Sequence, residues 1–362
     1  MRIFYASDTT PNSAFKSNIW RNNLLLPLLD LGHEVIEFDY DLSETFKHLN
    51  TKNAKNLTFV KENRPKVSNA LINQISKAHS IKPVDLFFSY FYDACVLPEI
   101  IDKIKSLGIK TVNWYCNGAH QLHLVSEISP HYDWCLVPEK NRIKDYIAMG
   151  VNPIYSQEAA NPSIYKPYDL DKEFDVTFVG QAYGDRPQFI NQIIEDGINI
   201  HVWGKNWEKY SKNTNTLKNN LLGWVQKKNR IQIPAGNIGG ILSDEEMIKM
   251  YSRSKINLGF STCGVTHKDE ERVLQVRLRD FEVPMSGGFY MVEYMEELEE
   301  FYEIGKEIVC YNNVDDLIEK IHYYLKHDDE QEVIRKAGYQ RCLRDHTWHI
   351  RFQKAFEKMD LR

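Results

Sequence analysis

The chain has 362 residues, of which 43% are hydrophobic, 12% aromatic and 26% charged, and its formal net charge is -5. This length and composition are those of an ordinary globular protein with about two domains. The small negative charge gives no electrostatic reason to expect a nucleic-acid or anionic-membrane partner.

Short apolar strands alternate with amphipathic helices in the first part of the chain. Three glycines, Gly32, Gly108 and Gly150, follow predicted helices, as is common at helix C-termini. The β-α-β-α order indicates parallel strands with helical crossovers. We predict strands at 1–7, 33–38, 85–90, 111–116 and 134–137, and helices at 20–31, 67–79, 97–107 and 141–149.

A loop with three prolines, roughly 152–174, is the best candidate for a domain linker. The alternation then restarts, so we predict two doubly wound, Rossmann-like α/β domains. These face each other across a deep cleft, with the carboxyl ends of both sheets toward it. The expected strands lie at 175–179, 198–203, 255–260, 288–292 and 307–311, and the expected helices at 187–196, 245–252, 314–327 and within 331–359.

The first predicted strand runs into a long polar loop, which should face the cleft. Its polar candidates for a ligand contact are Ser7, Asp8, Asn12 and Ser13. The loop lacks the G-x-G-x-x-G pattern, which disfavours a dinucleotide site of the dehydrogenase type. A plain surface loop explains the same residues.

A glycine turn in the second half leads from a strand into a helix. Gly180 ends the strand, and Arg186 precedes a proline at the first helical position. The start of a helix offers free N–H groups to an anion, and arginine suits phosphate. An ordinary turn with a surface arginine is the alternative.

The strongest candidate for a binding site in the sequence is the group Arg277, Arg279 and Glu282, followed by Gly287 and Gly288. Arginines can hold a diphosphate in a bidentate manner, a carboxylate can accept hydrogen bonds from a ribose diol, and glycines let a ligand approach the backbone. The alternative is an Arg–Glu ion pair on a helix flank with a glycine turn.

Several of these segments together resemble the CgeB-type, spore-protein-like branch of the GT-B glycosyltransferases. The similarity runs from end to end and is densest over 175–350. It implies a GT-B fold and a glycosyltransferase that takes its sugar from a nucleoside-diphosphate donor held by the C-terminal domain. The matching segments are LGHEV at 31–35, INLGFS at 256–261, RDFE at 279–282 with Gly287-Gly288, GKEIVCY at 305–311 and HTW at 346–348.

The resemblance also implies domain bounds and donor contacts. It places an N-terminal domain at 1–155, a linker at 156–174, the donor-binding domain at 175–340, and a C-terminal helix within 341–362 that returns to the N-terminal domain. It implies that Glu282 binds the ribose, that Arg186 contacts the diphosphate, and that Gly240 and Ile241 lie in the base-binding loop. Leu274 stands where related retaining enzymes have a first glutamate.

Asn117 stands where this branch has one or two aspartates, and an amide cannot act as a base. His120 and His123 are nearby and could substitute. A hydrogen-bonded loop histidine is the alternative. Asn117 and His120 are therefore the catalytic candidates on the acceptor side.

Two Asp-x-Asp triplets, at 39–41 and 169–171, are explained by solvated turn carboxylates. We expect no bound metal and no cofactor besides the nucleotide-sugar substrate, because helix dipoles and cationic side chains can stabilise a leaving diphosphate. The acceptor is not specified by the sequence. Two alternatives to a glycosyltransferase remain. One is a nucleotide-sugar epimerase on the same fold. The other is a non-catalytic, degenerate GT-B domain with a coat or scaffold role, and Leu274 and Asn117 favour this second alternative.

The N-terminal apolar run is too short for a signal peptide, and no window approaches the roughly 20 apolar residues of a membrane span. We therefore expect a cytoplasmic protein without stable membrane insertion. The six cysteines are scattered with no Cys-x-x-Cys pair, which favours buried thiols over a structural zinc site.

Overall fold

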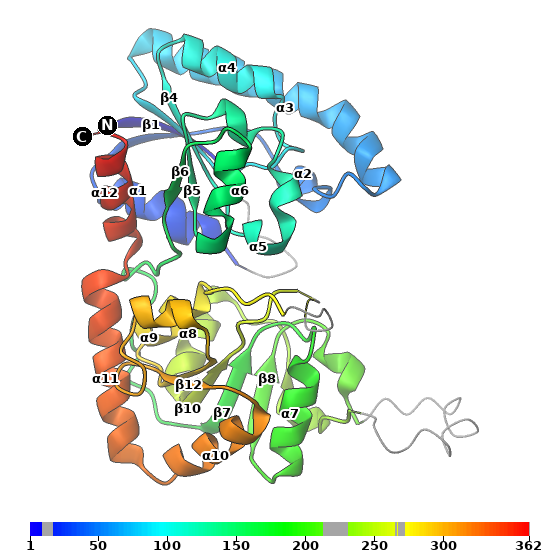
Figure 1. Ribbon diagram of the computed structural model, residues 1–362, viewed down its shortest axis with the longest axis vertical. Helices are drawn as coiled ribbons and strands as arrows, with labels where there is room; N and C mark the ends of the chain where they lie inside the picture. Colours follow the sequence, from blue (N-terminus) through cyan, green and yellow to red (C-terminus); the bar gives the residue numbers. More distant parts are fainter. Residues whose placement is uncertain (9–16, 213–230, 265, 267–271, 362) are drawn as a thin grey trace. The chain divides into compact units, whose positions relative to one another are not determined.

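The computed structural model describes residues 1–8, 17–212, 231–264, 266 and 272–361. These residues form two compact units. The first contains residues 1–8, Asn18–Asn161 and the C-terminal segment that begins at Thr347, and the second contains Pro162–His346. The first unit holds the blue and cyan elements of Figure 1 together with its red C-terminal helix.

The first unit is built on a six-stranded parallel sheet with the strand order β2-β1-β3-β4-β5-β6. Ile3 of the central strand pairs with Val35 on one side and Leu86 on the other. The direction of winding reverses between β1 and β3. The strands are β1 (Arg2–Ala6), β2 (Glu34–Glu37), β3 (Leu86–Ser89), β4 (Lys110–Trp114), β5 (Trp134–Val137) and β6 (Pro153–Tyr155).

The helices of this unit include one that is much longer than predicted. Helix α3 begins directly after Asn53, whose side chain accepts a hydrogen bond from the Lys55 amide at 2.9 Å. Its first turns expose mostly polar residues, so they lack the apolar stripe that marks a helix in a sequence. The helices are a π-helical turn (Arg21–Leu25), α1 (Leu26–Asp30), α2 (Ser43–Lys47), α3 (Ala54–Ile81), α4 (Pro98–Ser106), α5 (Gly118–Gln121) and α6 (Ile143–Ala148).

Helix α12 (Trp348–Lys358) belongs to the first unit and packs against α1. The Thr347 side chain caps its first turn by accepting from the Ile350 amide at 3.2 Å. Trp348 is fully buried, and its ring meets that of Trp114 at a centroid distance of 5.3 Å. A fully buried tryptophan contributes several kcal/mol of hydrophobic stabilisation, which fixes the return of the chain to this unit.

The second unit has its own six-stranded parallel sheet, with the order β12-β11-β10-β7-β8-β9. The chain runs from β7 to β8 and β9 on one side and then crosses to β10 on the other side of β7. The two parallel sheets confirm the predicted α/β fold class. The strands are β7 (Phe174–Val179), β8 (Ile200–Trp203), β9 (Ile238–Gly239), β10 (Ser254–Gly259), β11 (Tyr290–Glu293) and β12 (Val309–Tyr311).

Apolar residues of α7 and α10 join those of the sheet in the main core of this unit. Helices α8 and α9 contact β10. Ser243 and Glu246 form a reciprocal capping box at the start of α8. The helices are α7 (Arg186–Glu195), α8 (Asp244–Arg253), α9 (Arg279–Met285), α10 (Val314–Tyr324) and α11 (Asp328–Asp345).

The unit boundaries differ slightly from the expected ones. The first unit continues to Asn161, past residue 155, and the second ends at His346 rather than at 340. Much of the expected linker belongs to the second unit, because Lys172 Nζ donates to the carbonyls of Ser252 and Ser254 at 2.7 and 3.0 Å. All six cysteines are buried free thiols, as predicted. In the part of the chain that is described, no helix has the length and apolar character needed to cross a membrane.

Candidate functional site

The candidate donor residues gather where the winding of the second sheet reverses, between β7 and β10. In open α/β sheets, ligands bind outside the carboxyl ends of the strands at such a point. The loop after β7 runs from Gly180 to Asp185 and leads into α7, and the segment after β10 leads through Arg277 into α9. Arg186 is the first residue of α7 and Arg279 the first of α9, so the three candidate arginines come from the two connections that flank the reversal point.

Gly180 directly follows β7 and leaves no room for a side chain. Its carbonyl accepts a hydrogen bond from Trp207 Nε1 at 2.7 Å. A Cβ atom here would lie 2.5 Å from the Phe178 ring and 3.2 Å from Nη2 of Arg279. The glycine thus lets the Arg279 guanidinium lie against the backbone at the carboxyl edge of the sheet.

We expect Gly180→Ala to destabilise the fold by about 1–3 kcal/mol, the usual cost of overpacking, because the packed Phe178 ring has to move. The new methyl group would also displace the Arg279 guanidinium from its place against the Gly180 backbone. Gly236→Ala is the matched control, since a Cβ there meets nothing within 4 Å. Chemical denaturation of both variants tests this. Equal stability of the two would show that the close packing at Gly180 is unimportant.

Arg186 is a buried arginine, 4% exposed, at the first position of α7. Its guanidinium stacks 3.8 Å from the Tyr183 ring centroid, and Nη1 donates to the Gln181 carbonyl at 3.1 Å. Nε has no partner among the described residues. Burial, with contributions from neighbours that include Arg279 and Arg277, lowers the pKa of Arg186 to about 10.

Arg277 and Arg279 complete a cationic cluster with Arg186. The guanidinium carbons of Arg279 and Arg186 lie 5.4 and 5.2 Å from the same Phe178 ring centroid. Arg277 Nη2 donates to the Thr262 carbonyl at 2.6 Å. Within the described chain, Nε of both Arg277 and Arg279 has no partner.

Arg186 is buried and Arg277 and Arg279 are half-buried, so three cations with unused Nε donors are costly to keep together here. An anion with several oxygens would satisfy these donors and offset the mutual repulsion of Arg186, Arg277 and Arg279. Guanidinium groups match phosphate oxygens in geometry. The cluster is therefore suited to a phosphate or diphosphate group.

Asp280 is a fully buried acid beside this cluster that the sequence pattern did not single out. Oδ2 accepts from the Arg277 amide at 2.7 Å, and Oδ1 accepts from the Tyr290 hydroxyl at 2.6 Å. Burial raises the pKa of Asp280 to about 6. These two bonds fix the turn that leads from Arg277 into α9.

Glu282 lies two residues further along α9 and is 4% exposed. The Tyr165 side chain forms a hydrogen bond with its carboxylate, while Oε1 has no partner in the described part of the chain. Burial raises the pKa of Glu282 to about 7, although Tyr165 and Arg279 act in the opposite direction. A buried carboxylate oxygen without a partner can accept a hydrogen bond from a ligand hydroxyl.

Gly240 and Ile241 follow β9, also at the carboxyl edge of the sheet. Gly240 is exposed, and its carbonyl accepts from the Gly204 amide at 3.1 Å. Gly204 in turn lies against the Gly180 carbonyl, where any side chain would clash. Backbone contacts thus join the ends of three neighbouring strands, β7, β8 and β9.

Gly287 and Gly288 lie elsewhere, and this corrects the expectation that they admit a ligand. They precede β11, which places them at the amino edge of the parallel sheet. A Cβ on Gly287 would lie 2.9 Å from Pro167, and one on Gly288 would lie 2.8 Å from Asn257 Nδ2. Both are buried, and Gly287 has φ of +68°. They allow α9 to turn tightly into β11.

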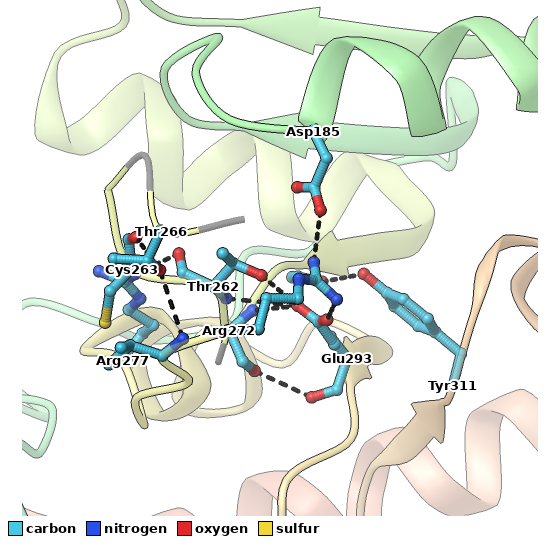
Figure 2. Close-up of polar contacts among 11 residues, drawn as sticks. Asp185, Thr262, Cys263, Thr266, Arg272, Arg277, Glu293 and Tyr311 are labelled. Atoms are coloured by element: carbon cyan, nitrogen blue, oxygen red, sulfur yellow. Dashed lines mark hydrogen bonds and ion pairs between the residues drawn. The ribbon is translucent and has the colours of Figure 1, made fainter. Parts of the chain in front are cut away.

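An arginine that sequence reasoning missed joins the two loops of the site. Arg272 forms ion pairs with Asp185, at the end of the loop after β7, and with Glu293, at the end of β11. Figure 2 shows Arg272 between these two carboxylates, with Arg277 reaching toward Thr262. No local motif could reveal this bracket, because its members lie far apart in the sequence.

The acceptor-side candidates lie in the first unit. Ser7 is buried directly after β1, and Asp8 follows it, whereas Asn12 and Ser13 lie outside the described residues. Asn117 precedes α5, which contains His120, and the Asn117 amide donates to Cys116 Sγ at 3.6 Å.

A carboxylate that the sequence did not indicate also lies near these residues. Oε2 of Glu139 lies 2.9 Å from where a Cβ on Gly118 would stand. Among the Asp-x-Asp triplets, Asp41 accepts from the Ser43 amide at 2.9 Å as a turn carboxylate. Asp169 and Asp171 are exposed.

Residues 186–357 match the glycosyl transferase-like family. This range includes the three arginines, Glu282, Arg272 and Glu293. No curated protein matches the sequence of the chain. The family match thus covers much of the second unit and α12.

Solved structures resemble the chain along almost its whole length. Sucrose-phosphate synthase from Thermosynechococcus elongatus has a TM-score of 0.62 at 12% identity, with 99% of this chain and 98% of that one covered. Anabaena HepE, in complex with UDP and glucose, has a TM-score of 0.60 at 12% identity, with 99% of each chain covered. A Listeria monocytogenes protein named as a UDP-N-acetylglucosamine 2-epimerase has a TM-score of 0.52 at 12% identity, covering 95% of this chain and 94% of its own.

At identities this low, the similarity of these structures to the chain establishes the fold and nothing more. The chain therefore has the GT-B fold of two-domain glycosyltransferases, and its C-terminal half matches a glycosyl transferase-like family in sequence.

Proposed function

We propose that the protein is a glycosyltransferase that moves a sugar from a nucleoside-diphosphate donor, held by the second unit, to an acceptor hydroxyl. The observation that carries this proposal is the cluster of Arg186, Arg277 and Arg279 at the reversal point of the sheet, each with an unused Nε. Glu282, with one unused carboxylate oxygen, lies on the same helix as Arg279. Together they offer donors for a diphosphate and an acceptor for ribose hydroxyls.

In the proposed reaction the acceptor oxygen bonds to the anomeric carbon of the sugar. The bond from that carbon to the diphosphate oxygen breaks, and the leaving nucleoside diphosphate keeps the electron pair. The arginine cluster and the N-terminal end of α7 stabilise this negative charge. The similarity of 186–357 to a glycosyltransferase family and the UDP bound by HepE both support this assignment.

Finer assignments are proposals that rest on the sequence motifs. The matching segments favour the CgeB-type branch, and a cytoplasmic location is a separate proposal. Gly240 and Ile241 are proposed to face the base. In the first unit, His120 is proposed to take the acceptor proton, because imidazole exchanges protons near neutral pH, and Asn117 to orient the acceptor by hydrogen bonds.

An assay of donor turnover tests the proposal. The full chain is incubated with a panel of nucleotide sugars, with and without a mixture of glycan and protein acceptors, and released nucleoside diphosphate is measured. Release that depends on an acceptor supports glycosyl transfer. Conversion of the sugar without any acceptor would instead favour an epimerase, which the similarity to the Listeria protein keeps as the second candidate.

We predict that donor binding does not require a divalent metal ion, because three guanidiniums already supply the positive charge that a metal would bring to a diphosphate. The Kd for a nucleoside diphosphate should change less than about twofold when EDTA replaces Mg²⁺, a difference under about 0.4 kcal/mol. Titration calorimetry in both buffers measures this. Binding that EDTA abolishes and Mg²⁺ restores would contradict the prediction.

A further inference from the structure

Glu293 is a buried carboxylate at the end of β11 whose two oxygens are both occupied by protein groups. Oε1 accepts from Arg272 Nη1 at 2.6 Å. Oε2 accepts from the amides of Ser261 and Thr262 at 3.0 and 3.3 Å, and from the Thr262 hydroxyl at 3.2 Å. Because both oxygens are occupied in this way, we do not place Glu293 in contact with the ligand.

One set of contacts leads from Glu293 to Arg277. The Glu293 carboxylate accepts a hydrogen bond from the Thr262 amide, and the Thr262 carbonyl accepts one from Arg277 Nη2 at 2.6 Å. Thr262 also pairs with Leu274 in a short antiparallel bridge, beside which the Gln275 amide donates to the Ser261 carbonyl at 3.0 Å. The direction of the Arg277 guanidinium therefore depends on where Glu293 places Thr262.

A second set of contacts leads from Glu293 to Arg186. Arg272 bridges Glu293 and Asp185, as Figure 2 shows. Asp185 precedes Arg186, the first residue of α7. A single buried carboxylate is thus connected to arginines on both sides of the reversal point.

We propose that Glu293 is a positioning residue for the proposed donor site. It acts through Thr262 on Arg277, and through Arg272 and Asp185 on Arg186, so that both guanidiniums are held ready for a diphosphate. Preorganised donors bind an anion more tightly than mobile ones, because less ordering is needed on binding. This inference rests on the proposed function.

The test compares Glu293→Gln with wild type in titrations against UDP, GDP, ADP, CDP and dTDP, using the tightest binder and its parent nucleoside as probes. The amide keeps the shape but replaces one acceptor oxygen with a donor group. We expect the nucleoside diphosphate to bind about tenfold more weakly, and the nucleoside to bind within about twofold of wild type. Glu307→Gln is the matched control, because Glu307 accepts from the Glu303 amide at 2.8 Å and lies 3.9 Å from Arg341, outside this network.

Arg272→Lys provides a second variant in case Glu293→Gln folds poorly. Its side chain is 34% exposed, so the fold should tolerate the change, but a lysine cannot bridge both acids as a guanidinium does. We expect a several-fold loss for the diphosphate only. In a double-mutant cycle, Glu293→Gln should cost less in an Arg277→Ala background than in wild type, because part of its action is transmitted through Arg277.

The outcomes separate this inference from the proposed function. If wild type binds none of the five nucleoside diphosphates, the proposed donor site is wrong. If wild type binds one but Glu293→Gln and Arg272→Lys bind it equally well, the positioning role is overturned. Equal losses for diphosphate and nucleoside would also overturn it, since they would indicate general structural damage.

Discussion

Replacing Arg279 by alanine is expected to weaken nucleoside-diphosphate binding by about 1.5–3 kcal/mol, roughly ten- to hundredfold, the range for hydrogen bonds to charged groups. Arg279 lies against Gly180 at the carboxyl edge of β7, and its Nε has no partner within the described residues. Binding of the parent nucleoside should change little, because the lost interaction involves the phosphates.

Arg186→Ala should show the same pattern, since both guanidiniums lie over the Phe178 ring. Arg253→Ala is a suitable control, because Arg253 is the last residue of α8, directly before the amino end of β10, and pairs with Glu173. Titration calorimetry with a nucleoside diphosphate and its nucleoside measures the difference. Equal losses for both ligands would mean that Arg279 and Arg186 support the fold and do not hold a diphosphate.

Glu282→Gln is expected to cost about 1–3 kcal/mol of nucleotide affinity, because the variant loses a charged acceptor for the ribose hydroxyls. The unused Oε1 of Glu282 is the atom that would receive this bond. A nucleotide with both ribose hydroxyls removed should bind wild type and variant about equally. If the variant binds the intact nucleotide as tightly as wild type, Glu282 is not the ribose ligand.

The same substitution should change how stability depends on pH. Burial raises the pKa of Glu282 from 4.5 to about 7, so the folded state keeps a proton that the unfolded chain has released. The stabilisation from this proton is fully present below pH 4.5 and is lost as the pH rises to about 7. Glu282→Gln removes this loss, so between pH 4.5 and 8 the variant should gain up to about 3 kcal/mol relative to wild type.

Chemical denaturation at several pH values measures this gain. The nearby Asp280, whose pKa is raised to about 6, is present in both proteins and largely cancels in the comparison. A difference in stability that does not vary with pH would contradict the assigned protonation behaviour of Glu282.

Much of the fold could be predicted because its signals are local. Gly32, Gly108 and Gly150 end helices with φ between 80° and 84°, a conformation that glycine adopts without strain. The apolar strands were found for the same reason, since burial on both faces produces short continuous apolar runs. The first turns of α3 were missed because they present mostly polar side chains to solvent.

The candidate site was predictable only where one short segment contributes several groups. Arg279 and Glu282 lie in the first turn of α9, and Arg277 lies two residues before it. Their close spacing in the sequence therefore indicated a site. The bracket of Asp185, Arg272 and Glu293 joins three separate segments, and only the order of the strands brings them together.

The two glycines at 287 and 288 were misassigned for a different reason. Their sequence pattern shows a tight turn but not whether the turn serves a ligand or the packing. Their position before β11 places them at the amino edge, where Pro167 and Asn257 fill the space beside them. Strand direction, and not the presence of glycine, therefore decides which turns face the site.

Thermal-shift titration of the whole chain tests most directly whether the second unit binds a nucleoside diphosphate through its arginine cluster. A ligand that binds only the folded state adds about 2.7 kcal/mol of stability at a hundred times its Kd. We predict that at least one of UDP, GDP, ADP, CDP and dTDP raises the melting temperature of wild type in the presence of EDTA. The titration of Arg279→Ala should shift to roughly ten- to hundredfold higher ligand concentration. No rise with any of the five, or the same titration for wild type and Arg279→Ala, would contradict the claim.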